Sequence, residues 1–136
     1  MQYLVDANVL SEATKPRPAP AAIEWLLANE TEIVVNPIIL GELRYGILQL
    51  PAGKRRTRLE QWFAGGLKRI HVVDLNADTA DVWAILLAEL KRQGRSMPVK
   101  DSLIAATARQ HGLIVATRNI GDFQYAGVTV FNPFEI

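Results

Sequence analysis

The stretch from Tyr3 to Glu12 constrains the fold most, because the apolar residues Tyr3-Leu4-Val5 run directly into Asp6. A short, continuous apolar run is typical of a strand that is buried on both faces, as in a parallel sheet. Asp6 would then lie at the carboxyl end of that strand, which is the edge where open α/β sheets bind their ligands. The stretch therefore predicts a buried strand with a carboxylate at the ligand-binding edge.

Short apolar strands alternate with helical stretches along the rest of the chain. We expect strands at residues 32–35, 71–74, 113–116 and 128–131. Between them, apolar periodicity and capping signals predict helices at residues 21–29, 36–50, 52–67, 76–90 and 102–111, with a turn or short helix at 119–123. This alternation favours one α/β domain over residues 1–136, with a mostly parallel five-stranded sheet covered by helices on both faces.

Composition narrows the class of protein. The chain has no cysteine, which excludes disulfides and thiolate metal sites, and its two histidines argue against a zinc site of the usual type. No apolar run is long enough to span a bilayer, and the N-terminal residues lack the basic and apolar regions of a signal peptide. We therefore expect a cytoplasmic protein that makes no membrane contact.

Basic residues form two patches, although the net charge is only +1. One patch contains Arg55, Arg56 and Arg58, and the other contains Arg92 and Arg95. Each patch can be read as a solvated helix face or as a rim that attracts the phosphates of a nucleic acid. The charges alone leave both readings open.

Four acidic residues that are far apart in sequence fall at comparable ends of the expected elements, and each also has an ordinary structural reading. Asp6 can form a turn with Asn8, and Glu42 can be a solvated helix residue. Asp101 can cap the helix that follows it, and Asp122 can belong to a polar turn. Taken one at a time, these carboxylates are weak signals.

Together, the four carboxylates predict a cation site. If the first strand lies beside the strand at 113–116, the residues after both strands meet where the chain changes direction in the sheet. Four carboxylates in one cleft repel one another unless a cation is present, and oxygen ligands suit Mg²⁺ or Mn²⁺. Such an ion can activate a water and neutralise charge on a phosphodiester.

Several stretches carry a resemblance to a known family. They are Leu4-Val-Asp-Ala-Asn-Val-Leu-Ser-Glu12, Pro37-Ile-Ile-Leu-Gly-Glu-Leu-Arg-Tyr-Gly46, Asp101-Ser-Leu-Ile-Ala-Ala-Thr-Ala108, Thr117-Arg-Asn-Ile-Gly-Asp-Phe123 and Val130-Phe-Asn-Pro-Phe134. In this order and spacing, the chain resembles PIN domains, and among them the VapC toxins near the FitB-like branch. The resemblance covers nearly the whole chain.

The resemblance implies an α/β/α sandwich and an Mg²⁺-dependent endoribonuclease, with the four carboxylates as catalytic and metal-binding residues. Asn8, Thr117 and Asn119 match supporting positions of the family. One departure is Ala7, where many relatives carry Thr or Ser, so a hydrogen bond near the site is expected to be missing. The resemblance also implies an RNA substrate, an antitoxin partner, a homodimer, and contact with DNA only through the antitoxin.

Three other readings compete with a nuclease. A phosphoacceptor receiver domain would use Asp74 as acceptor, but no lysine follows the later strands and Arg118 is the nearest basic residue. A haloacid-dehalogenase-type phosphatase would need a second Asp where Asn8 stands. A PIN fold kept only for binding is the third alternative, and RNA cleavage would decide against it.

Overall fold

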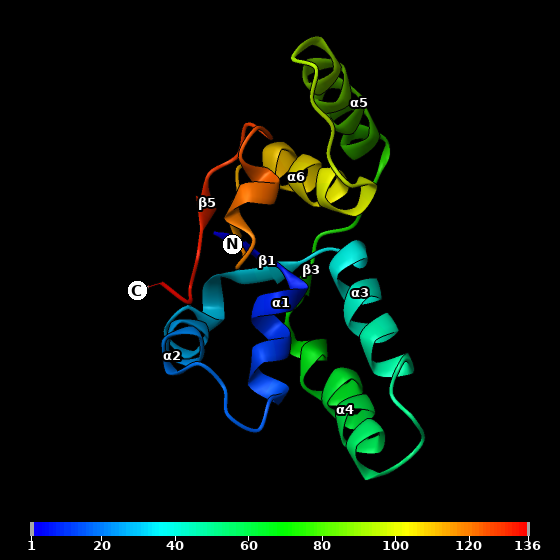
Figure 1. The fold of residues 1–136 in the computed structure, drawn as a ribbon, viewed down its shortest axis with the longest axis vertical. Coiled ribbons are helices and arrows are strands. Elements are labelled where there is room, and N and C mark those ends of the chain that lie inside the picture. The colour runs from blue at the N-terminus through cyan, green and yellow to red at the C-terminus, as the bar shows by residue number, and fades with distance from the viewer. Residues whose placement is uncertain (1, 136) are drawn as a thin grey trace.

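The computed structural model describes residues 2–135, apart from the side chain of Lys68. The outermost residues of the expected 1–136 domain therefore lie outside the described part. Within it, five strands form one parallel sheet in the order β3-β2-β1-β4-β5 (Figure 1). The strands are β1 (Tyr3–Val5), β2 (Ile33–Val35), β3 (His71–Val72), β4 (Ile114–Ala116) and β5 (Val130–Phe131).

Helices cover both faces of this sheet. The α-helices are α1 (Ala7–Leu10), α2 (Pro20–Ala28), α3 (Pro37–Leu48), α4 (Lys54–Gly65), α5 (Ala77–Arg92) and α6 (Val99–His111). Short 3-10 helices are η1 (Ser11–Thr14), η2 (Glu30–Glu32), η3 (Leu67–Arg69) and η4 (Ile120–Phe123). Figure 1 shows α5 and α6 above the strands and α1, α2 and α4 below them. The predicted α/β/α sandwich is confirmed, and its sheet is entirely parallel.

The central strand β1 is buried on both sides, as its apolar run predicted. Leu4 and Val5 are fully buried, and β1 pairs with β2 on one side and with β4 on the other. Val34 and Val115 face Leu4 in the sheet register and are also buried. The strand order brings the residues after β1 and after β4 to the same edge, although they are far apart in sequence.

Helix α6 begins earlier than the sequence predicted, and Asp101 does not cap it. Pro98 is the N-cap, with an extended ψ of 142°, and its carbonyl accepts a hydrogen bond from the Ser102 amide at 3.0 Å. The predicted start at residue 102 was therefore wrong by three residues, because the proline supplies the turn into the helix. Asp101 lies inside the first turn, so its carboxylate is not used as a cap.

The remaining bounds differ from expectation by a few residues at the element ends. Helix α3 ends at Leu48 rather than near residue 50, and α4 starts at Lys54. Asn76 caps α5, which extends to Arg92 rather than ending at residue 90. No helix within residues 2–135 is both long and apolar enough to cross a membrane.

Candidate active site

Asp6 joins the carboxyl ends of β1 and β4. Its Oδ1 accepts a hydrogen bond from the Ala7 amide at 2.8 Å, and its Oδ2 accepts one from Thr117 Oγ1 at 2.8 Å. The Asp6 amide donates to the Ala116 carbonyl at 2.9 Å. Only 5% of Asp6 is exposed, so these bonds hold a largely buried carboxylate in one orientation. Asp6 also caps α1, which is the turn-forming role that its sequence context indicated.

Asn8 and Thr117 support Asp6 through a small polar network. Asn8 Nδ2 donates to Thr117 Oγ1 at 3.2 Å and to Asp6 Oδ2 at 3.4 Å. Asn8 Oδ1 accepts from the Arg118 amide at 3.1 Å, and Thr117 Oγ1 accepts from the Asn119 amide at 3.1 Å. Asn8 and Thr117 thus act through their side chains, whereas Asn119 contributes its backbone amide.

Glu42 extends from α3 and meets a lysine from α6. Lys100 Nζ lies 3.0 Å from Glu42 Oε2, and the Lys100 side chain remains 56% exposed. The other carboxylate oxygen, Oε1, is buried without a hydrogen-bond partner. Burial raises the pKa of Glu42, the Lys100 hydrogen bond lowers it, and the negative charge of Asp6 raises it further. Lys100 lies on a different helix from Glu42, so helical spacing within α3 could not have predicted this pair.

Asp101 and Asp122 complete the group of four. Burial, followed by the charges of Asp6, Asp122 and Glu42, raises the pKa of Asp101 from 3.8 to about 6. Burial also raises the pKa of Asp6, against the lowering effect of its Thr117 hydrogen bond. Asp6 and Asp101 therefore lie within electrostatic reach of each other and of both Glu42 and Asp122, and Asp122 is exposed on η4.

Glu12, a buried carboxylate outside this group, has a lowered rather than a raised pKa. Glu12 is only 4% exposed, but it accepts a hydrogen bond from the Ala19 amide at 2.7 Å and lies 2.9 Å from Lys15 Nζ. Its hydrogen bond with Lys15 lowers the pKa of Glu12. Burial therefore does not by itself raise a carboxylate pKa here, whereas the pKa values of Asp6, Glu42 and Asp101 are all raised.

The donor set fits a hard cation that keeps some of its water. Within residues 2–135, no three acidic or histidine side chains already stand close enough to hold one ion. Mg²⁺ is bound through one or two carboxylates and several waters, so it does not require three converging side chains. The oxygen-only ligands, the raised carboxylate pKa values and the unpartnered Glu42 Oε1 all favour such an ion.

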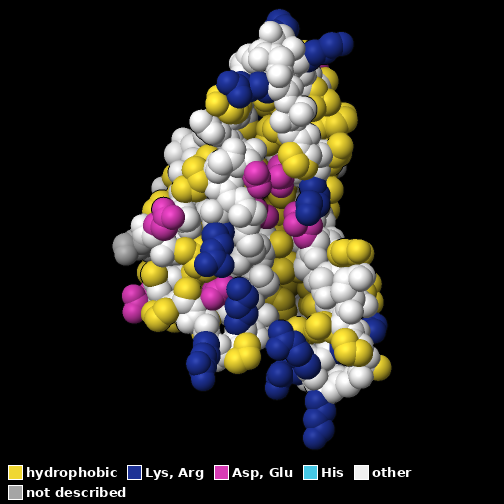
Figure 2. Space-filling view, viewed as in Figure 1, with side chains coloured by type: hydrophobic (Ala, Val, Ile, Leu, Met, Phe, Trp, Pro, Cys, Tyr) yellow, Lys and Arg dark blue, Asp and Glu magenta, His cyan; other side chains and the backbone are white. Residues whose placement is uncertain are grey.

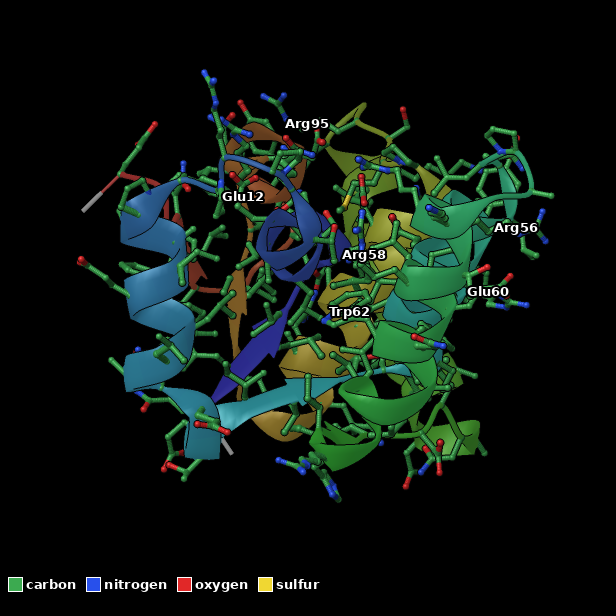
Figure 3. The ribbon with its side chains drawn as sticks, turned by 90° about the horizontal axis from the view of Figure 1, so that it is seen from below. Glu12, Arg56, Arg58, Glu60, Trp62 and Arg95 are labelled. Carbon is green, nitrogen blue, oxygen red and sulfur yellow. The ribbon has the colours of Figure 1, made fainter. Side chains whose placement is uncertain are left out.

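The predicted basic residues lie in different surroundings. Arg55 lines a cavity of about 320 Å³ together with Asn8 and Glu42. Arg56 donates to Glu60 at 3.1 Å, and Figure 3 shows this pair on the outer side of α4. Arg58 is exposed on the same helix.

Arg92 lies in the last turn of α5 and is exposed, and Arg95 follows it in the connection to α6. Figure 2 shows acidic side chains gathered in the middle of one face, with basic side chains above and below them. The face that carries the acidic group is therefore bordered by positive charge.

Comparison with known proteins places the chain in a family. The PIN domain matches residues 3–127. The chain is 36% identical over 136 residues to the VapC ribonuclease Y4jK of Sinorhizobium fredii, with 97% of each chain covered. It is also 36% identical over 140 residues to toxin FitB of Neisseria gonorrhoeae, covering 96% of this chain and 97% of FitB.

Solved structures agree with the sequence matches. The FitAcB crystal structure from Neisseria gonorrhoeae matches with a TM-score of 0.93 at 32% identity, covering 99% of this chain and all of the other. The structure of FitAB bound to an IR36 DNA fragment matches with a TM-score of 0.92 at 30% identity, covering 99% and 97%. The chain belongs to the PIN-domain family. Its relatives within that family are the VapC-type toxin ribonucleases.

Proposed function

We propose that this chain is an Mg²⁺-dependent endoribonuclease, the toxin of a type II toxin–antitoxin pair, with Mn²⁺ as an alternative ion. The observation that carries the proposal is that Asp6, held by hydrogen bonds where β1 and β4 end, lies within electrostatic reach of Glu42, Asp101 and Asp122. The PIN match decides against the receiver and phosphatase readings. A PIN fold kept only for binding remains the alternative that the experiment below separates.

The chain's own residues prepare the site for hydrolysis of an RNA phosphodiester. Thr117, Asn8 and the Ala7 amide orient Asp6, and its Oδ1, which accepts only the Ala7 hydrogen bond, retains a lone pair for a further ligand. The cation, when bound, supplies an activated water and neutralises charge on the phosphate. Lys100 adds a positive charge beside Glu42, which weakens the repulsion between the acidic group and an anionic substrate.

The basic residues are proposed to guide RNA toward the four carboxylates. Arg55, Arg58, Arg92 and Arg95 are exposed, and the first of these lines the cavity next to Glu42. Arg56 is paired with Glu60, so we expect it to contribute less than its neighbours. Backbone phosphates are attracted by such positive charges irrespective of sequence.

An antitoxin is the proposed protein partner. Structures similar to this chain include FitAB bound to a DNA fragment and VapBC of Salmonella typhimurium bound to DNA. We propose that a cognate antitoxin blocks the acidic cleft, with an arginine or lysine facing the carboxylates. We further propose that the toxin forms a homodimer and reaches DNA only through the antitoxin.

The decisive experiment is RNA cleavage by Asp6→Asn, with Asp74→Asn as the matched control. Asp74 is exposed after the edge strand β3 and was the acceptor in the receiver reading. We expect Asp6→Asn to abolish cleavage and Asp74→Asn to retain it. A chelator should stop the wild-type reaction and Mg²⁺ should restore it.

Undiminished cleavage by pure Asp6→Asn, or cleavage that survives chelation, would overturn the proposal. RNA binding by the wild type with no cleavage at any Mg²⁺ concentration would instead favour the binding-only alternative.

A further inference from the structure

A cavity of about 320 Å³ opens beside Asp122 and separately from the cavities that adjoin Glu42. It lies between η4 and the connection at 93–98, which runs from the end of α5 to the start of α6 (Figure 1). Arg95, Ser96 and Met97 line one side, and Tyr125 lines the other. One candidate catalytic carboxylate therefore forms part of the wall of a separate cavity.

Arg95 and Tyr125 form a stacked pair in this wall. The guanidinium carbon of Arg95 lies 3.4 Å from the centroid of the Tyr125 ring. Both side chains remain exposed, Tyr125 to 44%, although the contact covers part of each. The pair is therefore a flat, positively charged platform that is open to solvent, rather than a core contact.

A flat cationic platform beside an acidic site suits one chemical group, a nucleotide of single-stranded RNA. Unstacked bases bind on aromatic rings and on guanidinium planes, and the edge N–H groups of arginine donate to phosphate. A cavity of this size is in the range of small-ligand sites. The base can thus lie on the platform while the N–H groups of Arg95 donate to a backbone phosphate beside it.

We propose that this cavity binds the nucleotide next to the scissile phosphate, with its base stacked on the Arg95–Tyr125 pair. This inference rests on the proposed ribonuclease function. It assigns to Arg95 a role that differs from that of the other basic residues, because it contacts a base as well as attracting phosphate. Tyr125, which the sequence did not single out, becomes a substrate-binding residue.

The test compares the binding of two probes to a variant that is expected not to cleave RNA. Asp6→Asn in Mg²⁺ is titrated, by fluorescence anisotropy, with a short fluorescein-labelled single-stranded RNA and with a fully abasic RNA of the same length. Stacking of one base predicts that Tyr125→Ala weakens RNA binding by about five- to a hundred-fold. The abasic probe should bind Tyr125→Ala as it binds the parent, and Tyr125→Phe should resemble the parent with both probes.

Two arginine variants separate charge from stacking. Arg95→Lys removes the planar guanidinium, so it should weaken RNA binding. Because it keeps the positive charge, it should leave binding of the abasic probe unchanged. Arg92→Ala removes an exposed arginine at the end of α5 and should weaken both probes to the same extent. Melting temperatures establish whether each variant is folded. If Tyr125→Ala does not fold, Arg95→Lys decides the test.

The outcomes distinguish this inference from the function on which it rests. If Asp6→Asn binds neither probe, the base-binding proposal fails, whereas the ribonuclease proposal fails only if the wild type does not cleave RNA in Mg²⁺. Suppose that Asp6→Asn binds RNA more tightly than the abasic probe. If neither Tyr125→Ala nor Arg95→Lys changes this preference, only the base-binding proposal is overturned. Equal weakening of both probes by Tyr125→Ala would also overturn it, since Tyr125 would then only position Arg95.

Discussion

At the scale of single residues, the carboxylates differ in how far hydrogen-bond donors and positive charges offset their negative charge. Asp6 has hydrogen-bond donors on both oxygens, and Glu42 has Lys100 on one oxygen. The pKa of Asp101 is raised to about 6 by burial and by the negative charges of the other three carboxylates. Asp101 is therefore the residue at which relief of repulsion should be easiest to measure.

We predict that Asp101→Asn stabilises the metal-free protein at neutral and higher pH. The folded-state pKa of Asp101 is about 6, above its ordinary value of 3.8, so its contribution to stability is present below pH 3.8 and lost as pH rises through about 6. Removing the charge should raise the free energy of unfolding by about 1–2 kcal/mol above that range, after allowance for solvent screening. Near pH 4 the two proteins should differ much less.

The measurement is a series of thermal melts at several pH values, with and without Mg²⁺. Mg²⁺ should raise the melting temperature of the wild type, and that of Asp101→Asn by a smaller amount, because a ligand stabilises the state that binds it. A destabilised Asp101→Asn in metal-free protein, together with equal Mg²⁺ shifts, would argue against the four-carboxylate site.

At the scale of elements, the relative position of α3 and α6 sets the site, because these helices carry Glu42 and Asp101. Asn36 joins them and is fully buried. Its Oδ1 accepts from the Ile39 amide at 2.9 Å, which caps α3, and its Nδ2 donates to Thr107 Oγ1 on α6 at 3.0 Å. One side chain thus starts one helix and ties it to the other.

We predict that Asn36→Ala lowers the free energy of unfolding by about 2–3 kcal/mol, through loss of the cap and of the buried Thr107 bond. It should also weaken the Mg²⁺-induced rise in melting temperature, because α3 and α6 lose a fixed spacing. Asn76→Ala is the matched control, since Asn76 caps α5 through Thr79 and lies exposed. That variant should cost about 1 kcal/mol and leave the Mg²⁺ response intact. Equal Mg²⁺ responses in both variants would refute a role for Asn36 in the site.

At the scale of the whole molecule, the arrangement of charges on one face matters more for binding than the net charge does. The net charge is only +1, yet basic side chains border the acidic group on one face (Figure 2). Binding of RNA to this face should depend on salt, because each phosphate contact releases counterions.

We predict that Arg55→Ala and Arg58→Ala each weaken RNA binding and reduce the slope of log affinity against log salt by about 0.7–1. Arg69→Ala is the control, because Arg69 precedes β3 and so lies near the amino edge of the sheet, away from the carboxylates. Binding assays over a range of salt concentrations measure the slope. If the wild type and the three variants have identical slopes, Arg55 and Arg58 are only solvated residues of α4 and do not contact RNA phosphates.

Expression in a bacterial host tests the toxin role and the assembly. We expect the chain alone to arrest growth, and Asp6→Asn or coexpression of the cognate antitoxin to relieve the arrest. We also expect a homodimer by light scattering at micromolar concentration. Harmless expression of a protein that cleaves RNA in vitro would contradict the toxin role, and a monomer at that concentration would contradict the dimer.

Much of the fold was accessible from the sequence, because strands, helices and caps depend on neighbouring residues. The apolar run before Asp6 predicted the buried β1, and Asn36-Pro37 predicted the start of α3. The start of α6 was missed, because Asp101 and Pro98 both carry helix-start signals and local preferences alone do not rank them. Periodicity likewise predicted a sheet without establishing that every strand is parallel.

By itself, the sequence determined which residue types end the strands and begin the helices, since those patterns are local. Only the tertiary structure decided what they contact. Lys100 meets Glu42 across 58 residues of chain, and Thr117 meets Asp6 across 111. The stacking of Arg95 on Tyr125 is of the same kind. Such contacts depend on the strand order β3-β2-β1-β4-β5, which follows from how the whole chain buries its apolar surface and not from any one stretch of it.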